Sequence, residues 1–298
     1  MNWTSNGPLL MFLANLLFGL VPIMVRTASR EHIDSTEITF FRFLVSCAGV
    51  MAIWTMGWGH LRAKNWKGLF WRGFFGAISV LLYFYAVQET GAAKGALLNY
   101  THAIWANLYA VLIFRHKTPK GFWPLMGLAF LGVWLVLNPH FTSINRGDLA
   151  GILSGACSGG AVLSVKHLRK TDNALTILAS LSFAGLIASL LIGFFPGSAA
   201  HSWTPNWTIP NSVGWIALIL MATFAMGGQL LFTHAYAYTS IPLGTLMALS
   251  VPAIAALGSR VYLNEPLTPH FLLGGAMILT ACGVLGIIEG RDRLDDPE

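Results

Sequence analysis

The chain has 298 residues, of which 55% are hydrophobic and only 10% carry a formal charge, and its mean hydropathy is +0.63. Soluble globular proteins have roughly 25% charged residues, so this chain lacks the polar surface that a water-soluble protein needs. The net charge of +6 could suggest a nucleic-acid partner, but the basic residues stand in short segments between apolar runs, where membrane topology explains them better. We therefore expect an all-α integral membrane protein with no nucleic-acid partner.

The sequence lacks the motifs of a disulfide or zinc site, of an ATP-driven pump and of a signal peptide. Cys47, Cys157 and Cys282 lie far apart in apolar segments, so neither a disulfide nor a zinc site is expected. No glycine-rich run precedes a Lys-Ser or Lys-Thr pair, which argues against an ATP-driven pump in one chain. The first apolar run lacks a basic start and a small-residue cleavage pattern, so it is predicted to be a membrane span and not a signal peptide. No cofactor is expected.

Ten segments of the chain have the length and apolar character of a membrane-spanning helix, which needs about 20 mainly apolar residues. The predicted spans are Gly7–Thr27, Ile38–Gly57, Gly68–Gln88, Ala92–Phe114, Phe122–His140, Asp148–His167, Ala174–Phe195, Val213–Tyr238, Pro242–Tyr262 and His270–Glu289. Most connections between them are short, and a packed helical bundle is therefore expected.

The 18 Lys and Arg residues are divided unevenly between the two sides that these spans define. With the N-terminus in the cytoplasm, 12 fall on the cytoplasmic side, five on the other side, and Arg42 inside the second span. The first cytoplasmic connection is taken to include Arg62, Lys64, Lys67 and Arg72. Because cytoplasmic loops carry an excess of Lys and Arg, both termini are predicted to lie in the cytoplasm, with the protein in the cell inner membrane.

The two halves of the chain resemble each other in sequence. YFYAVQETGAAKGALLNYTHAIWANLYAVLIFRHKTP (Tyr83–Pro119) aligns with HAYAYTSIPLGTLMALSVPAIAALGSRVYLNEPLTP (His234–Pro269). Tyr85 then falls on Tyr236, and both stretches end on Thr-Pro. Chance similarity between apolar helices is the alternative, but the shared Tyr-x-Ala and Thr-Pro steps argue against it together.

This alignment predicts a 5+5 inverted repeat, with residues 1–145 as the first five-helix unit and residues 146–298 as the second. An odd number of spans separates the aligned stretches, so the second copy crosses the membrane in the opposite direction. Inverted repeats place the solute site near the membrane midplane, where the halves meet.

Three stretches carry a resemblance to a known family: FFRFLVSCAGV in the second span, YFYAVQETGAAKGALL across the third and fourth, and SIPLGTLMALSVPAIAALGSRVYLNEPLT across the ninth and tenth. They resemble the drug/metabolite transporter superfamily in its ten-helix EamA-like branch. The resemblance implies a 5+5 bundle that moves small organic solutes, often amino acids or other metabolites and frequently outwards.

The sequence departs from that family pattern in two places. FRHKT follows the fourth span where the family usually carries an acidic turn residue. Pro252 in the ninth span has no counterpart in the fourth, where Thr101 and His102 stand. A titratable group thus occupies a position at which the family pattern implies a backbone break.

His102 lies about ten residues into its predicted span, which puts it near the bilayer centre. Asn99 and Trp105, three residues before and after it, share its helix face. Because an ionisable residue inside a membrane is costly, it indicates function, and we expect these three side chains to bind the solute. The alternative is a neutral histidine that only holds helices together.

Other polar residues complete the predicted site. Tyr83, Gln229 and His234 are candidate solute contacts, although polar aromatic residues at span ends are also typical of the membrane interface. Asn15 is grouped with small polar residues that are expected to bond within the bundle. Gln229 is the exception, because its side chain is too long to bond only its own helix.

Arg42 and Lys94 are predicted to make an outer vestibule cationic, which would suit a solute with a carboxylate or a phosphate. The structural alternative for Arg42 is pairing with Glu37. The alternatives for Lys94 are extension to the outer surface or pairing with Glu89.

The leading functional hypothesis is a secondary transporter of small organic solutes that works by alternating access, as a monomer or a weak homodimer. The rival is a membrane enzyme acting on a lipid or an isoprenoid, which usually needs gathered carboxylates, histidines or a metal set. All 12 acidic residues stand in loops, tails or span ends, and no HExxH motif is present. Since no carboxylate stands at mid-span, we expect facilitated diffusion or exchange, with no proton coupling.

Overall fold

The computed structural model describes residues 6–33, 35–90, 92–138, 145–194, 209–263 and 268–295, and within these ranges every regular element is an α-helix. The helices are α1 (Gly7–Arg30), α2 (Ser35–Thr55), α3 (Trp66–Thr90), α4 (Ala92–Tyr100), α5 (His102–Phe114), α6 (Phe122–Leu137), α7 (Arg146–Leu168), α8 (Ala174–Phe194), α9 (Ser212–Ala235), α10 (Ile241–Ala248), α11 (Ser250–Leu263) and α12 (Pro269–Asp295).

Ten helical segments correspond to the ten predicted spans. In the described part of the chain, nine segments are long and apolar enough to cross a membrane, by length and composition, and α6 is a shorter apolar helix of 16 residues. Two of the nine spans are formed by pairs of helices, α4 with α5 and α10 with α11. The prediction of an all-α membrane protein with about ten spans is confirmed.

The fourth and ninth spans are both interrupted near their middle. α4 ends one residue before Thr101 and α5 begins one residue after it, while α10 and α11 are separated by Leu249. At the first break, the Thr101 hydroxyl donates to the Leu98 carbonyl at 2.6 Å, and the Thr101 amide reaches the same carbonyl at 3.3 Å. Such three-residue bonds tighten the helix locally. The fourth span is broken although it lacks the proline of the ninth.

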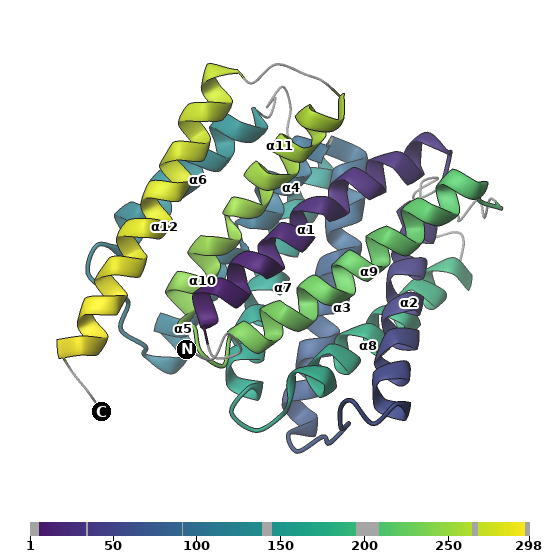
Figure 1. The fold of residues 1–298 in the computed structure, drawn as a ribbon, viewed down its shortest axis with the longest axis horizontal. Coiled ribbons are helices and arrows are strands. Elements are labelled where there is room, and N and C mark those ends of the chain that lie inside the picture. The colour runs from purple at the N-terminus through teal and green to yellow at the C-terminus, as the bar shows by residue number, and fades with distance from the viewer. Residues whose placement is uncertain are drawn as a thin grey trace.

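Each helix of residues 7–137 packs against a helix of residues 146–295. α1 packs against α9, α2 against α8, α3 against α7 and α6 against α12, and Figure 1 shows α6 and α12 together at the left edge of the bundle. The two broken spans also cross between the halves: α4 and α5 pack against α7, and α11 packs against α1.

The α6–α12 contact depends on two glycines. A Cβ atom added at Gly132 would lie 2.6 Å from the Gly274 carbonyl oxygen, and one added at Gly274 would lie 2.5 Å from the Gly132 carbonyl oxygen. Glycine is therefore needed on both helices, because any side chain would push the two backbones apart.

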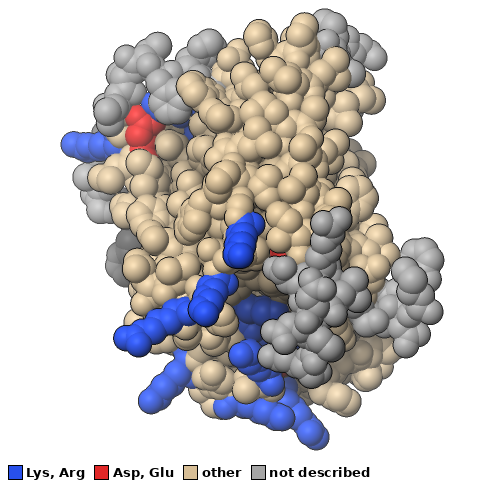
Figure 2. All heavy atoms as spheres, turned by 90° about the vertical axis from the view of Figure 1, so that its left-hand side faces the viewer, with Lys and Arg blue, Asp and Glu red and all other residues tan. Residues whose placement is uncertain are grey.

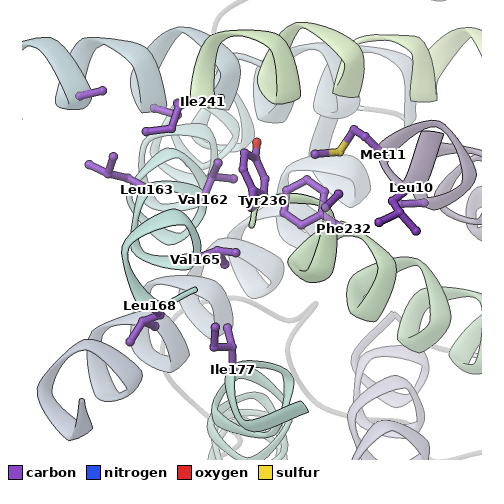
Figure 3. Close-up of a cluster of buried hydrophobic side chains, with 14 of the residues drawn as sticks. Leu10, Met11, Val162, Leu163, Val165, Leu168, Ile177, Phe232, Tyr236 and Ile241 are labelled. Carbon is purple, nitrogen blue, oxygen red and sulfur yellow. The ribbon is translucent and has the colours of Figure 1, made fainter. Parts of the chain in front are cut away.

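One buried apolar cluster joins α1, α7 and α9, with contributions from neighbouring helices (Figure 3). Tyr236 and Met11 are fully buried there, and the Phe232 ring meets the Tyr236 ring edge-on at 4.8 Å. At the edge of α9, the Lys166 ammonium donates to the carbonyls of Tyr236 and Thr239 at 2.9 and 2.8 Å. A cation at these carbonyls stabilises the C-terminal end of α9 and ties α7 to it.

Basic side chains are concentrated at one end of the bundle. On the face shown in Figure 2, Lys and Arg gather mainly in the lower part and the surface above is largely uncharged. The α5–α6 connection contributes three exposed cations, Arg115, Lys117 and Lys120. In Figure 1, the connections α2–α3 and α7–α8 reach the same lower end.

Candidate functional site

A cavity of about 200 Å³ lies within the bundle. Its described lining comes from α1, α2, α3 and the α4–α5 break in the first half, and from α7, α8, α9 and the α10–α11 break in the second. Among the described residues, α6 and α12 contribute nothing to it. Both halves of the chain therefore line one cavity, and the breaks in the fourth and ninth spans form part of its wall.

The break between α4 and α5 supplies a polar part of the wall. Asn99 donates through Nδ2 to the Ser154 hydroxyl at 2.6 Å, and His102 Nδ1 lies 3.2 Å from the Asn99 carbonyl oxygen. Because a carbonyl oxygen only accepts hydrogen bonds, this Nδ1 carries the proton, and Nε2 of the neutral ring is left as an acceptor. The Tyr100 ring lies 5.5 Å from the imidazole and also lines the cavity.

Five of the eight residues predicted for the site line this one cavity: Asn99, His102, Tyr83, Gln229 and Arg42. They come from four separate regions of the chain and meet only through the fold. Gln229 has one modest bond to its own helix, from Nε2 to the Thr233 hydroxyl at 3.4 Å.

Trp105 and His234 lie elsewhere. The Trp105 ring is 6.0 Å from the Tyr109 ring, and its Cβ packs against Gly159 of α7. His234 stands in the last turn of α9, with its ring edge-on to Tyr238 at 5.7 Å. Neither is among the residues described as lining the cavity.

Lys94 is held by an acidic partner that sequence analysis did not identify. Its ammonium lies 2.7 Å from Asp148 Oδ1 and 2.8 Å from Oδ2, with both side chains buried. Asp148 also accepts from the Asn145 amide at 2.9 Å in the capping box that begins α7. The pair neutralises Lys94 and joins α4 to α7, whereas sequence analysis had considered Glu89 as the partner.

Sequence analysis placed Arg72 in a cytoplasmic connection, and this assignment is wrong. Arg72 lies in the second turn of α3, is only 4% exposed, and lines the cavity. Two signals in the sequence could have revealed it. Arg72 falls inside the predicted span Gly68–Gln88, and Gly76 stands one helical turn after it, where a bulky side chain would block its path.

Asn15 is a second cavity residue that sequence analysis treated as structural. It is 1% exposed, and its Nδ2 donates to the Met247 carbonyl at 2.8 Å and to the Ser250 hydroxyl at 3.2 Å. Its Oδ1 is buried without a hydrogen-bond partner in the described structure. Asn15 therefore both fastens α1 to the α10–α11 break and offers an unused acceptor.

Comparison with models of protein families identifies the family of this chain. The model of the EamA-like transporter family matches residues 5–138 and residues 145–287. The chain belongs to this family. It is accordingly a multi-pass membrane protein of a transporter family, as the resemblance in its sequence implied. Among the residues that the structure describes, no group of three or more His, Cys, Asp or Glu side chains is placed to hold a metal ion.

Curated relatives match over most of the chain. A pseudopaline exporter of Pseudomonas aeruginosa, CntI, is 22% identical over 93% of this chain and 95% of its own length. The threonine/homoserine exporter RhtA of Escherichia coli is 28% identical over 68% of this chain and 65% of its own. Mouse solute carrier family 35 member G1 is 24% identical over 89% of this chain and 73% of its own length. One crystal structure superposes with a TM-score of 0.78 at 14% identity, covering 96% of this chain and 98% of that one, which shows a shared fold.

Proposed function

We propose that this EamA-like protein is a secondary transporter that exports small organic solutes, such as amino acids or related metabolites, across the cytoplasmic membrane. The observation that carries the proposal is the central cavity, whose lining is shared between the two halves. In an alternating-access cycle the halves rock around a fixed site between them. Its volume of about 200 Å³ suits a small solute, since drug-sized ligands occupy pockets of roughly 300–1,000 Å³.

The outward direction is supported by the relatives. The curated names of two of them, CntI and RhtA, describe exporters, one of pseudopaline and one of threonine and homoserine. Threonine and homoserine are amino acids, and they are small enough to be sensible first substrates to test. We propose the same direction and a related substrate class for this chain.

We propose that both termini face the cytoplasm. The basic connections gather at one end of the molecule (Figure 2), and that end also carries the start of α1. Lys and Arg in short loops are retained on the cytoplasmic side. On this orientation the Lys94–Asp148 pair lies toward the outer end of the cavity and Lys166 toward the inner end.

Transport is proposed to be exchange or facilitated diffusion. The cavity has no Asp or Glu among its described lining residues, so a carboxylate proton relay through the middle of the bundle has no residues to use. His102 is the lining residue whose unperturbed pKa, about 6.5, is nearest neutrality, but a cation at that buried position would be costly.

Counterflow in proteoliposomes tests the function. Vesicles loaded with unlabelled L-threonine, or with other amino acids in turn, should accumulate the labelled solute transiently, and empty vesicles or vesicles without protein should not. A screen of amino acids and small metabolites in which the correctly folded protein exchanges nothing would rule the proposal out. Uphill accumulation driven by an imposed pH gradient and abolished by a protonophore, for a solute whose charge does not follow pH, would overturn the uncoupled mechanism alone.

A further inference from the structure

Within the proposed transport function, we propose that the cavity binds an amino acid by two ends. The solute's carboxylate lies between the guanidinium groups of Arg42 and Arg72, and its amino group donates to Oδ1 of Asn15.

The Arg72 side chain has the features of a group that binds an anion. It is 4% exposed, its side chain lines the cavity, and its Nε has no hydrogen-bond partner in the described structure. Its guanidinium lies against Gly76, where an added Cβ would collide with Nη1. The glycine thus leaves a recess for the guanidinium, and Leu181 of α8 borders the same recess. Because the guanidinium of Arg72 has room beside Gly76 and its Nε–H has no partner in the described structure, it can donate a hydrogen bond to an anion in the cavity.

Arg42 brings a second positive charge to the same cavity. It is half-buried, and its guanidinium carbon stands 5.6 Å from the centre of the Phe43 ring. Arg42, Arg72 and Tyr83 all line the same cavity. Neither arginine forms an ion pair within the described residues, and the described lining contains no carboxylate.

A buried and a half-buried arginine in one cavity without an anion are unfavourable, because both have lost water and their like charges repel each other. A carboxylate placed between them would relieve both costs. It would also form charge-assisted hydrogen bonds, which arginine makes well through its planar fork of donors. The chemistry of the cavity therefore favours a solute with a negative group and disfavours a simple cation.

Asn15 supplies the second half of the recognition. Because its Nδ2 is engaged by the Met247 carbonyl, which can only accept, the amide cannot be turned over without losing that bond. Its Oδ1 therefore stays an acceptor, and this buried oxygen has no donor in the described structure. An ammonium group is a donor with three N–H bonds, so an amino acid satisfies the Asn15 acceptor and the arginine donors together.

The charge in the cavity is one-sided. Both arginines and Asn15 come from the first half of the chain, whereas α8 and α9 face the cavity with residues such as Leu181, Gln229 and Phe232. A zwitterion would therefore bind in one orientation, with its side chain toward the second half. The apolar Leu181 and Phe232 would select the solute's side chain.

Ligand-induced thermal stabilisation of the purified full-length protein tests the assignment. The probes are the proteinogenic L-amino acids, their carboxamide analogues, succinate and inorganic phosphate. At least one amino acid should raise the melting midpoint of the wild type, and its carboxamide, which lacks the negative charge, should bind at least tenfold more weakly. Equal binding of acid and carboxamide, stabilisation by phosphate or succinate with none by an amino acid, or stabilisation by no probe would overturn the proposal.

Arginine variants locate the site. Arg72→Gln should weaken binding of that amino acid at least tenfold, and Arg72→Lys should recover part of it, because the charge remains without the planar fork. The matched control is Arg62→Gln, which removes an exposed arginine of the α2–α3 connection and should leave binding unchanged. Binding that survives Arg72→Gln would exclude Arg72 as a ligand.

The solute-free protein provides a readout independent of binding. Arg72→Met removes an unpaired buried charge while keeping an apolar stem, so it should raise the melting midpoint of solute-free protein and abolish the shift caused by the amino acid. A lowered midpoint would show that Arg72 serves the fold, and the assignment would fail.

Transport separates this proposal from the one on which it rests. Wild-type vesicles that exchange neutral or cationic solutes, unaffected by Arg72→Gln, would leave the transporter standing and refute the arginine site. An amino acid that binds through Arg72 but is never exchanged would support the arginine site and refute the proposed transport function.

Discussion

The buried ion pair between α4 and α7 gives a stability prediction whose size follows from geometry. Lys94→Met removes the ammonium that lies 2.7 Å from Asp148 Oδ1, where the side chains of the pair are 7% and 9% exposed. At an effective dielectric constant of 20, that separation corresponds to about 6 kcal/mol of attraction, which desolvation of the two groups largely offsets. Removing one partner of a buried pair costs about 3–5 kcal/mol, because the remaining charge is left uncompensated.

We expect the low end of that range for Lys94→Met. The carboxylate of Asp148 keeps its hydrogen bond from the Asn145 amide at 2.9 Å, so it retains one favourable contact. The predicted loss is therefore about 3 kcal/mol in the free energy of unfolding. Adding Asp148→Asn removes the stranded charge at nearly constant size, and the double variant should fall within about 1 kcal/mol of the wild type.

The assay is a double-mutant cycle measured by reversible unfolding in detergent micelles, with thermal denaturation as a second readout. Lys117→Met is the matched control, because this lysine is exposed and should change stability by less than about 0.5 kcal/mol. A Lys94→Met protein within about 1 kcal/mol of the wild type, or a double variant no more stable than the single ones, would refute the assignment of a buried, coupled pair.

Three further predictions concern topology, the site and packing. Cysteines introduced at Lys117 and at Ile209, which is 97% exposed, should be labelled from opposite sides in a cysteine-free background, and an impermeant reagent that labels both from outside contradicts the orientation. His102→Ala should reduce transport at least tenfold while the protein stays monodisperse, and unfolding instead would mean that the histidine is structural. Gly132→Ala should destabilise the protein by about 1–3 kcal/mol through overpacking against α12, whereas Gly127→Ala, with open space around its added Cβ, should be neutral or slightly stabilising in a melting experiment.

The spans could be predicted from the sequence because hydrocarbon imposes a length on every apolar helix. The point at which a helix breaks inside a span was harder to predict. The break at Thr101 could be expected only from the family resemblance, since no proline marks it; the threonine hydroxyl bonds the Leu98 carbonyl there. Proline and glycine are visible in a sequence, but a hydroxyl that competes for a helix carbonyl is visible only once the backbone is known.

The site was predicted unevenly for a related reason. Asn99 and His102 stood out because polar residues at mid-span are rare and costly. Arg72 did not stand out, since a basic residue near a span end also follows the positive-inside rule. Lys94 was assigned to a cationic vestibule, and its partner could not be identified from spacing because Asp148 lies 54 residues away. Sequence spacing shows neighbours on one helix, and it does not show which helices face each other.

The shortness of α6 has a consequence for how the protein is made. At 1.5 Å per residue, its 16 residues extend about 24 Å, less than the roughly 30 Å of a bilayer's hydrocarbon core. Its Gly132 face is matched by α12, which is synthesised after all the other described helices. During synthesis α6 therefore remains mismatched, with a bare backbone face toward lipid, until α12 has been inserted. Chains truncated before α12 should be substrates for membrane quality control, with α6 as the segment that exposes them.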